Sequence, residues 1–209
     1  MRKIAALFLV FVILGGLCAC SSEERAAELV GVWETTGYYD GDAMMELFVY
    51  MDLYEEEMAL MDPAGIAYVQ TVILREDSTY TIGCDTAKSI AMAREYYVEV
   101  LDRFYEHREE LEGCYGVSFG AMGRDSFFKF YAELYGVENY DALIDLLTES
   151  TVDPDYLAEG EENGFYRVTP WRIYCTIDGE TGEDYIPYHL EDDCLTLDFY
   201  EGEQVYTRK

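Results

Sequence analysis

Few residues of this chain have the types and spacing that catalysis requires. Ser118 lies between Gly116 and Gly120 and so matches the Gly-x-Ser-x-Gly pattern of a nucleophilic serine. That pattern positions a nucleophile only where a buried strand precedes it, whereas a helix is predicted to precede it here. The only two histidines, His107 and His189, have no second histidine at a metal-ligand spacing. We therefore expect no catalytic residue and no enzyme activity.

Acidic residues are abundant, but none forms a recognisable metal site. The segment 178–184 carries four carboxylates, enough oxygen for weak calcium binding, yet it lacks the spacing of the twelve-residue calcium loop. A solvated hairpin tip is the favoured interpretation of this segment. No Cys-x-x-Cys pair suggests a zinc or redox centre. We expect neither a metal nor a cofactor.

The charge of the chain excludes a class of partners. It has 14 basic and 43 acidic residues, which gives a net charge of −29. Nucleic acids are bound by clustered Lys and Arg, and no such cluster follows Lys3. Anionic lipid headgroups would also repel the chain. With 50% hydrophobic residues and 20 Tyr, the chain is expected to fold around a core.

The first twenty residues have the layout of an export signal. Arg2 and Lys3 precede an apolar core over residues 4–14, and Leu17-Cys18-Ala19-Cys20 follows it. The apolar run 4–19 is 16 residues long, short of the roughly 20 that a membrane-spanning helix needs. The end of the segment resembles the lipobox of bacterial lipoproteins, which implies cleavage before Cys20 and diacylation of Cys20. We predict a signal peptide over 1–19, a lipidated tether over 20–28, and anchoring to the outer face of the cell membrane.

Four further cysteines leave two alternatives open, disulfides or buried free thiols. A helix predicted over 86–112 would be about 40 Å long and would keep Cys84 and Cys114 apart. Strand alternation places Cys175 on the face of Trp171 and Ile173, and Cys194 on the face opposite to that of Leu195. The second pair is therefore expected to point to different sides.

Alternating apolar and polar residues predict eight strands, and helical spacing predicts an insertion between them. The strands cover 29–36, 66–75, 78–84, 165–169, 171–177, 184–190, 194–199 and 204–208. Pro187 predicts that its strand is an edge or contains a bulge. Eight strands suffice for a closed barrel that side chains fill or that holds one small ligand. We predict an α+β fold, an antiparallel barrel over 29–209 with a helical insertion at about 86–163 whose helices cover 86–112, 126–135 and 140–149.

A methionine-rich helix is predicted over 43–61, where five of the eight Met residues fall. One interpretation is that these side chains fill the core. The other is that the helix covers the mouth of the barrel and lines an apolar pocket. The residues of that candidate pocket are Phe48, Tyr50, Met51, Tyr54 and Met58.

Gly31-x-Trp33 in the first strand and Arg208 in the last resemble the lipocalin superfamily and lipocalin-like domains of uncharacterised bacterial lipoproteins. The resemblance covers 29–36, 66–85 and 164–208 and excludes the helical insertion. It implies that Trp33 closes one end of the barrel and that Arg208 packs over it.

Two functions follow from this organisation. In the first, the protein is a non-catalytic envelope lipoprotein whose barrel or insertion binds an apolar small molecule. In the second, the barrel is filled and the protein is a structural or protein-interaction lipoprotein of the envelope. An open barrel interior would favour the first function, and a filled interior would favour the second.

Overall fold

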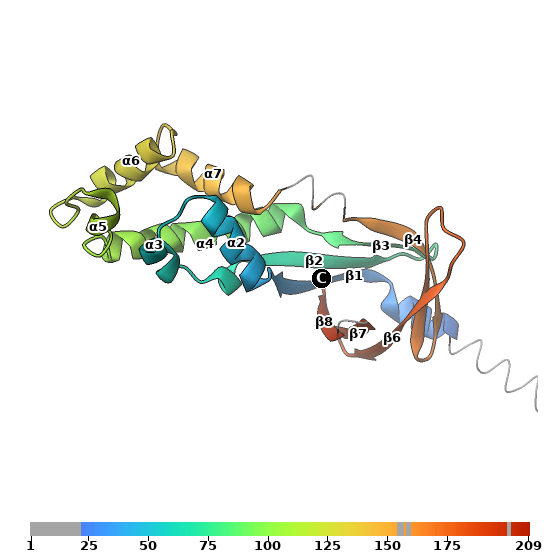
Figure 1. The fold of residues 1–209 in the computed structure, drawn as a ribbon. Coiled ribbons are helices and arrows are strands. Elements are labelled where there is room, and N and C mark those ends of the chain that lie inside the picture. The colour runs from blue at the N-terminus through green and yellow to red at the C-terminus, as the bar shows by residue number, and fades with distance from the viewer. Residues whose placement is uncertain (1–21, 154–156, 158–159, 200–201) are drawn as a thin grey trace, which may run out of the picture. The chain divides into compact units, whose positions relative to one another are not determined.

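The computed structural model describes residues 22–153, 157, 160–199 and 202–209, and it divides into two compact units (Figure 1). One unit consists of the chain up to Thr35, Gln70–Gly83 and Glu161–Lys209. The other consists of Thr36–Val69 and Cys84–Gly160. The predicted signal peptide and Cys20 lie outside the described residues. Among the described residues, no helix has the length and apolarity needed to span a membrane.

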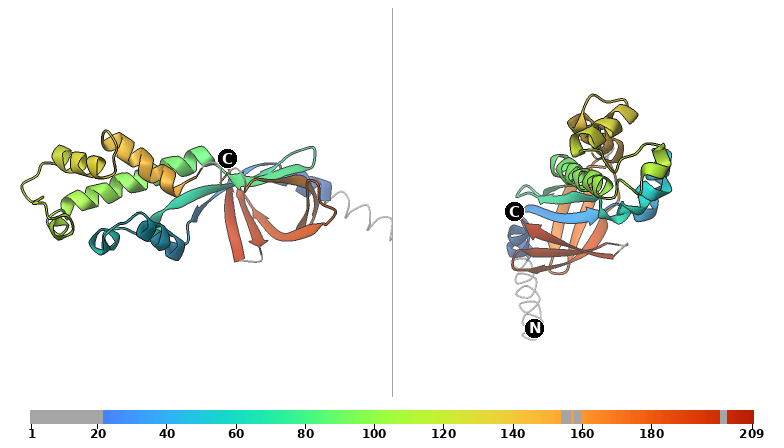
Figure 2. Two further views of the ribbon diagram at one scale, coloured as in Figure 1. Left: turned by 45° about the horizontal axis from the view of Figure 1, so that its top comes forward. Right: turned by 90° about the vertical axis from the view of Figure 1, so that its left-hand side faces the viewer.

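The first unit is built on a closed antiparallel barrel in which consecutive strands are neighbours and β8 returns to β1 (Figure 2). The strands are β1 (Gly31–Tyr38), β2 (Ala67–Leu74), β3 (Thr79–Cys84), β4 (Glu162–Thr169), β5 (Arg172–Ile177), β6 (Asp184–Glu191), β7 (Cys194–Phe199) and β8 (Gly202–Arg208). The prediction of eight strands forming a barrel is confirmed.

Pro187 is not on an edge, because β6 lies between β5 and β7. Its position explains how the ladder tolerates it. β6 pairs with β5 through residues 184–187 and with β7 through residues 188–191, so Pro187 stands where the pairing passes from one neighbour to the other. The missing N–H of proline therefore costs little at this point.

Side chains of the barrel strands pack together inside it. Alternate residues of the strands point inward and form one buried cluster, together with Leu29 from a helix over 22–29. The cluster consists of Leu29, Trp33, Val72, Leu74, Tyr80, Tyr166, Ile173, Cys175, Leu195, Leu197 and Tyr206. Gly164 makes room for Tyr80, because a Cβ at residue 164 would lie 2.7 Å from the Tyr80 ring.

The second unit is helical. It contains α2 (Gly41–Tyr50), α3 (Glu55–Ala59), a 3₁₀ turn η1 (Pro63–Gly65), α4 (Thr86–Glu106), α5 (Glu112–Tyr115), α6 (Arg124–Leu134) and α7 (Tyr140–Thr151). Its core is rich in aromatic rings in tilted or edge-to-face contact, for example Phe119 against Phe127 at 5.2 Å between centroids.

Two predicted helices are shorter than expected. The helix predicted over 43–61 is split into α2 and α3, because Asp52 adopts a left-handed conformation with φ 58°. The helix predicted over 86–112 ends at Glu106. After this residue the Arg108 guanidinium donates to the carbonyls of Tyr105, Phe119 and Gly120. These hydrogen bonds join the end of α4 to the segment 119–120.

The four cysteines Cys84, Cys114, Cys175 and Cys194 are free, but only Cys175 is a buried thiol as the second alternative required. Cys175 is buried and Cys194 is exposed, so the predicted opposite orientation of this pair is correct. The grouping of Trp171 with Ile173 is wrong. β5 begins only at Arg172, and Trp171 is exposed whereas Ile173 is buried.

Candidate functional site

The structure brings Trp33 and Arg208 together. They occupy paired positions of β1 and β8, and the Arg208 guanidinium lies 4.3 Å from the centroid of the Trp33 ring. Trp33 is completely buried, so the cation covers a ring that is already part of the barrel core.

These two side chains also hold the helix over 22–29 against the barrel. Trp33 Nε1 donates to the Leu29 carbonyl at 2.8 Å, and Arg208 Nη1 donates to the Val30 carbonyl at 3.0 Å. Arg208 Nη2 donates to the Glu28 carbonyl. The last carbonyls of a helix have no partner within the helix and carry the negative end of its dipole, so a guanidinium and an indole N–H stabilise this terminus.

A cleft of about 370 Å³ lies beside this terminus. It is lined by Arg25, Ala27, Glu28, Leu190, Asp192 and Arg208. Charges of both signs line it, and Arg25 and Glu28 are already paired at 2.7 Å. Such a lining does not suit an apolar ligand.

The five residues of the candidate pocket do not form one pocket. Phe48 is completely buried in the helical core, whereas Tyr50 is 86% exposed. The Tyr54 ring packs edge-on against Tyr115 at 5.0 Å, and Met58 is partly buried against the same core. The break at Asp52 is the physical reason, because the helical spacing that grouped these residues ends there.

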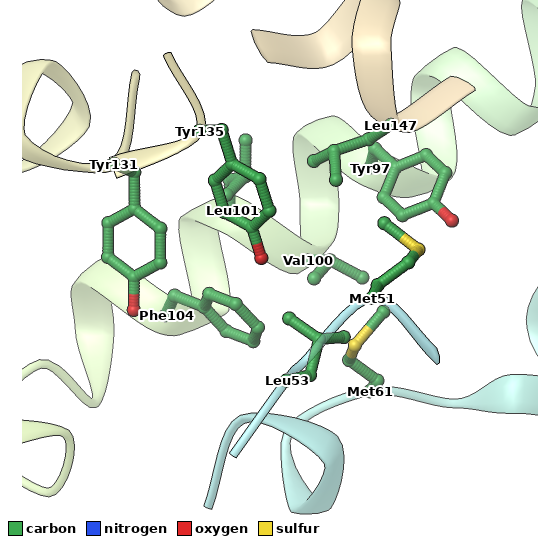
Figure 3. Close-up of a pocket in the computed structure, with 10 residues that line it drawn as sticks. All are labelled: Met51, Leu53, Met61, Tyr97, Val100, Leu101, Phe104, Tyr131, Tyr135 and Leu147. Carbon is green, nitrogen blue, oxygen red and sulfur yellow. The ribbon is translucent and has the colours of Figure 1, made fainter. Parts of the chain in front are cut away.

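Of the five, Met51 lines an apolar cavity of the helical unit (Figure 3). The lining comes from the loop after α2, the segment between α3 and η1, α4, the end of α6 and α7. It consists of Met51, Leu53, Met61, Tyr97, Val100, Leu101, Phe104, Tyr131, Tyr135 and Leu147. The cavity volume is about 10 Å³, which is about the space of one water molecule. The core interpretation of the methionine-rich segment is thus correct for Met44 and Met61, which are buried in this cluster.

A buried carboxylate that sequence reasoning missed lies at the centre of the helical unit. Glu57 of α3 has no exposed surface. Its Oε1 accepts from the hydroxyls of Tyr115 at 2.6 Å and Tyr131 at 2.8 Å, and its Oε2 accepts from the Tyr54 backbone N–H at 3.0 Å. The Glu57 carboxylate is thus the acceptor for all three donors. This agrees with the rule that buried polar groups form hydrogen bonds.

The environment of Glu57 keeps the two tyrosines protonated. Burial raises the pKa of Tyr115, and the hydrogen bond to Glu57 and its charge add to this effect. Burial likewise raises the pKa of Tyr131, followed by the charge of Glu57. Both hydroxyls therefore act as donors rather than as acids.

The remaining candidate groups for chemistry are placed in structural roles. Ser118 Oγ donates to Glu112 Oε1 at 3.2 Å, and α5 rather than a strand precedes it. The Gly120 N–H donates to the same carboxylate at 2.8 Å, which holds the pKa of Glu112 below its usual value. His107 pairs with Glu110. Across the described residues, no group of three His, Cys, Asp or Glu side chains could hold a metal ion.

Comparison of the chain with protein-family models, with curated proteins and with solved structures found no match.

Proposed function

We propose that this protein is a non-catalytic interaction module of the cell envelope, anchored to the membrane by a lipid on Cys20. The observation that carries the proposal is the buried cluster inside the barrel, which is formed by side chains of its own strands and Leu29. Function in such a protein resides on its surface. The lipobox pattern at residues 17–20 supports the anchoring.

We further propose that the barrel is lipocalin-like. Gly31-x-Trp33 in β1, Arg208 stacked over Trp33, and eight consecutive antiparallel strands support this assignment. A lipocalin-like barrel without an open interior would serve as a scaffold rather than as a carrier.

A role in binding an apolar small molecule is the weaker candidate. Sites for such ligands usually measure roughly 300–1,000 Å³ and are mostly apolar. The apolar cavity beside Met51 measures about 10 Å³. A second cleft of about 410 Å³ is lined by Arg124, Asp125, Lys129 and Glu138 among other residues, which gives it a charged rim.

The test uses the full chain purified from membranes. Organic extraction followed by mass spectrometry should recover no small molecule at stoichiometric amount. Formaldehyde treatment of intact cells should join the protein to a reproducible polypeptide. A Cys20→Ser variant should lose that product, because the protein leaves the membrane.

The control is Met51→Glu, which places a charge in the apolar cavity. If a small molecule is recovered at stoichiometric amount from the parent and is absent from this variant, the carrier function is correct and the interaction proposal is wrong.

A further inference from the structure

One part of the outer barrel surface, on strands β3 to β6, presents aromatic and basic side chains. Carboxylates from its margin contact four of its residues: Asp77 accepts from Thr79, Glu161 from Asn163 and Glu183 from Arg167, and Glu191 pairs with His189. The register of these strands alternates inward residues with outward ones. We define the β3–β6 face as eleven outward residues: Thr79, Asn163, Phe165, Arg167, Thr169, Arg172, Tyr174, Thr176, Tyr185, Pro187 and His189. Two of the acids at its margin are Glu183, before β6, and Glu191, at the end of that strand.

Two arginine guanidinium groups are stacked on two tyrosine rings of this face. The Arg167 guanidinium lies 3.7 Å from the centroid of the Tyr174 ring, and that of Arg172 lies 4.3 Å from the Tyr185 ring. The two tyrosine rings are 6.0 Å apart. Stacking holds each guanidinium in one orientation, which lowers the entropy that a partner would have to overcome on binding.

The two arginines differ in whether a carboxylate of the chain pairs with them. Arg167 donates to both carboxylate oxygens of Glu183, from Nε and from Nη2, each at 2.7 Å. Arg172 has no carboxylate within ion-pair distance in the described part of the chain. Its stacked cation is therefore available to an acceptor from outside.

Large aromatic side chains of β4, β6 and the turn before β5 are exposed to solvent. Trp171 is 77% exposed, Phe165 57% and Tyr185 53%. The backbone of Trp171 is nevertheless fixed, because its carbonyl accepts from the Tyr188 N–H at 3.2 Å. Trp, Tyr and Arg are the residues that contribute most often to protein–protein binding energy, and Asp and Glu are depleted there.

We propose that the β3–β6 face is the docking surface for a different polypeptide, which presents a carboxylate to Arg172 among apolar side chains that cover Trp171, Phe165 and Tyr185. This inference rests on the proposed interaction function and names its surface and the chemistry of its partner. A buried guanidinium without a partner is costly, so an occupant that covers the face must supply an anion. A second copy of the chain is disfavoured by the repulsion between two net charges of −29.

The experiment converts the expected ion pair into a covalent bond. Arg172→Lys keeps the cation and supplies an amine, and a water-soluble carbodiimide then joins that amine to a carboxylate in direct contact, with loss of water. Beyond Lys3 the chain has only three other lysines, Lys88, Lys129 and Lys209, so the background is low. Membranes carrying the full-length variant are treated, and the linked peptides are sequenced by mass spectrometry. We expect the amine introduced at residue 172 to be joined to Asp or Glu of another protein.

Val205→Lys is the matched control. Val205 is also an exposed residue of the barrel, but it lies on β8, outside the β3–β6 face. The amine introduced at residue 205 should form no intermolecular link. Trp171→Ala in the Arg172→Lys background should reduce the linked product at least tenfold without changing the circular dichroism spectrum, because Trp171 is exposed.

Three results would overturn the inference. They are links from the amine at residue 172 only to its own chain, links to a second copy, and equal links from the amine at residue 205. If formaldehyde still joins the Trp171→Ala variant to a partner, the proposed interaction function is supported, but the β3–β6 face is not the docking surface. If formaldehyde captures nothing from the parent, the interaction function itself fails.

Discussion

At the scale of single residues, Glu57 is a fully buried carboxylate that accepts three hydrogen bonds in the helical unit. It lies in a run of three glutamates, of which Glu55 and Glu56 are exposed. Nothing in that run distinguishes the buried member, because its donors Tyr115 and Tyr131 are 58 and 74 residues away in the chain. The only signal in the sequence is the excess of tyrosine.

Removal of the acceptor at residue 57 should destabilise the protein. Glu57→Leu leaves the buried hydroxyl of Tyr131, the part-buried hydroxyl of Tyr115 and the part-buried N–H of Tyr54 without an acceptor. Each such donor costs about 1–3 kcal/mol. We expect a loss of at least about 3 kcal/mol in the free energy of unfolding, measured by urea titration with circular dichroism. Glu57→Gln keeps one carbonyl oxygen for the tyrosines and should lose only about 1 kcal/mol.

Glu55→Gln is the control for this pair of variants. Glu55 is exposed and precedes Glu57 by two residues, so its substitution should leave stability unchanged. Equal stabilities of the Leu and Gln variants at residue 57 would show that the tyrosine hydroxyls do not need this acceptor.

At the scale of elements, the contact between the helix over 22–29 and the barrel joins the segment after Cys20 to the folded part of the chain. Trp33 and Arg208 come from the first and last strands, and both donate to the carbonyls at the end of this helix. A pair of residues from opposite ends of the barrel sequence thus fixes one short helix.

Arg208→Ala should release this helix. The variant loses a cation stacked on an indole, worth about 0.5–2 kcal/mol, and hydrogen bonds from a charged donor. We expect a decrease of about 2–3 kcal/mol in unfolding free energy and faster hydrogen exchange at the N–H groups of residues 26–30. Arg208→Lys keeps the charge but not the planar fork, and should fall between the parent and the alanine variant. Unchanged exchange in residues 26–30 would mean that Trp33 alone holds the helix.

The strands were predictable from the sequence, and the helix ends were not. Alternation of side chains is a local property, so β2, β3 and β7 begin and end within one residue of the predicted positions. The breaks at Asp52 and after Glu106 depend on a backbone conformation and on contacts of Arg108, which helical spacing does not reveal.

The candidate site was predictable only in part, for the same physical reason. Trp33 and Arg208 could be paired because a closed barrel brings its first and last strands together. The pocket residues could not be placed, since their proximity depended on one unbroken helix. The β3–β6 face could not be seen before the register of four strands was known.

At the scale of the whole molecule, the protein combines a strongly acidic composition with an interior rich in tyrosine. Burial raises the pKa of tyrosines in both units, and that of Tyr97 to about 12. The others with a raised pKa are Tyr80, Tyr96, Tyr115, Tyr131, Tyr135, Tyr140, Tyr166 and Tyr188. In the unfolded chain these groups ionise near pH 10.

Stability should therefore fall in alkaline solution. A folded-state pKa above the unfolded value favours the folded state fully below about pH 10, and this contribution is lost as pH rises through about 10 toward about 12. We expect two increases in the ultraviolet absorbance of tyrosinate. The second comes from the buried residues and coincides with loss of the helical circular dichroism signal. A single titration near pH 10 with unchanged circular dichroism would contradict this prediction.

The contrast between the two tryptophans gives the protein a built-in optical reporter. Trp33 is sealed in the barrel and Trp171 stands in solvent, so their emission should occur at shorter and longer wavelength respectively. Acrylamide should quench the red component alone while the barrel is intact. A Trp171→Phe protein would then report only on the barrel, and a Trp33→Phe protein only on the outer face. Folding and surface occupancy could be followed separately in one cuvette without any added label.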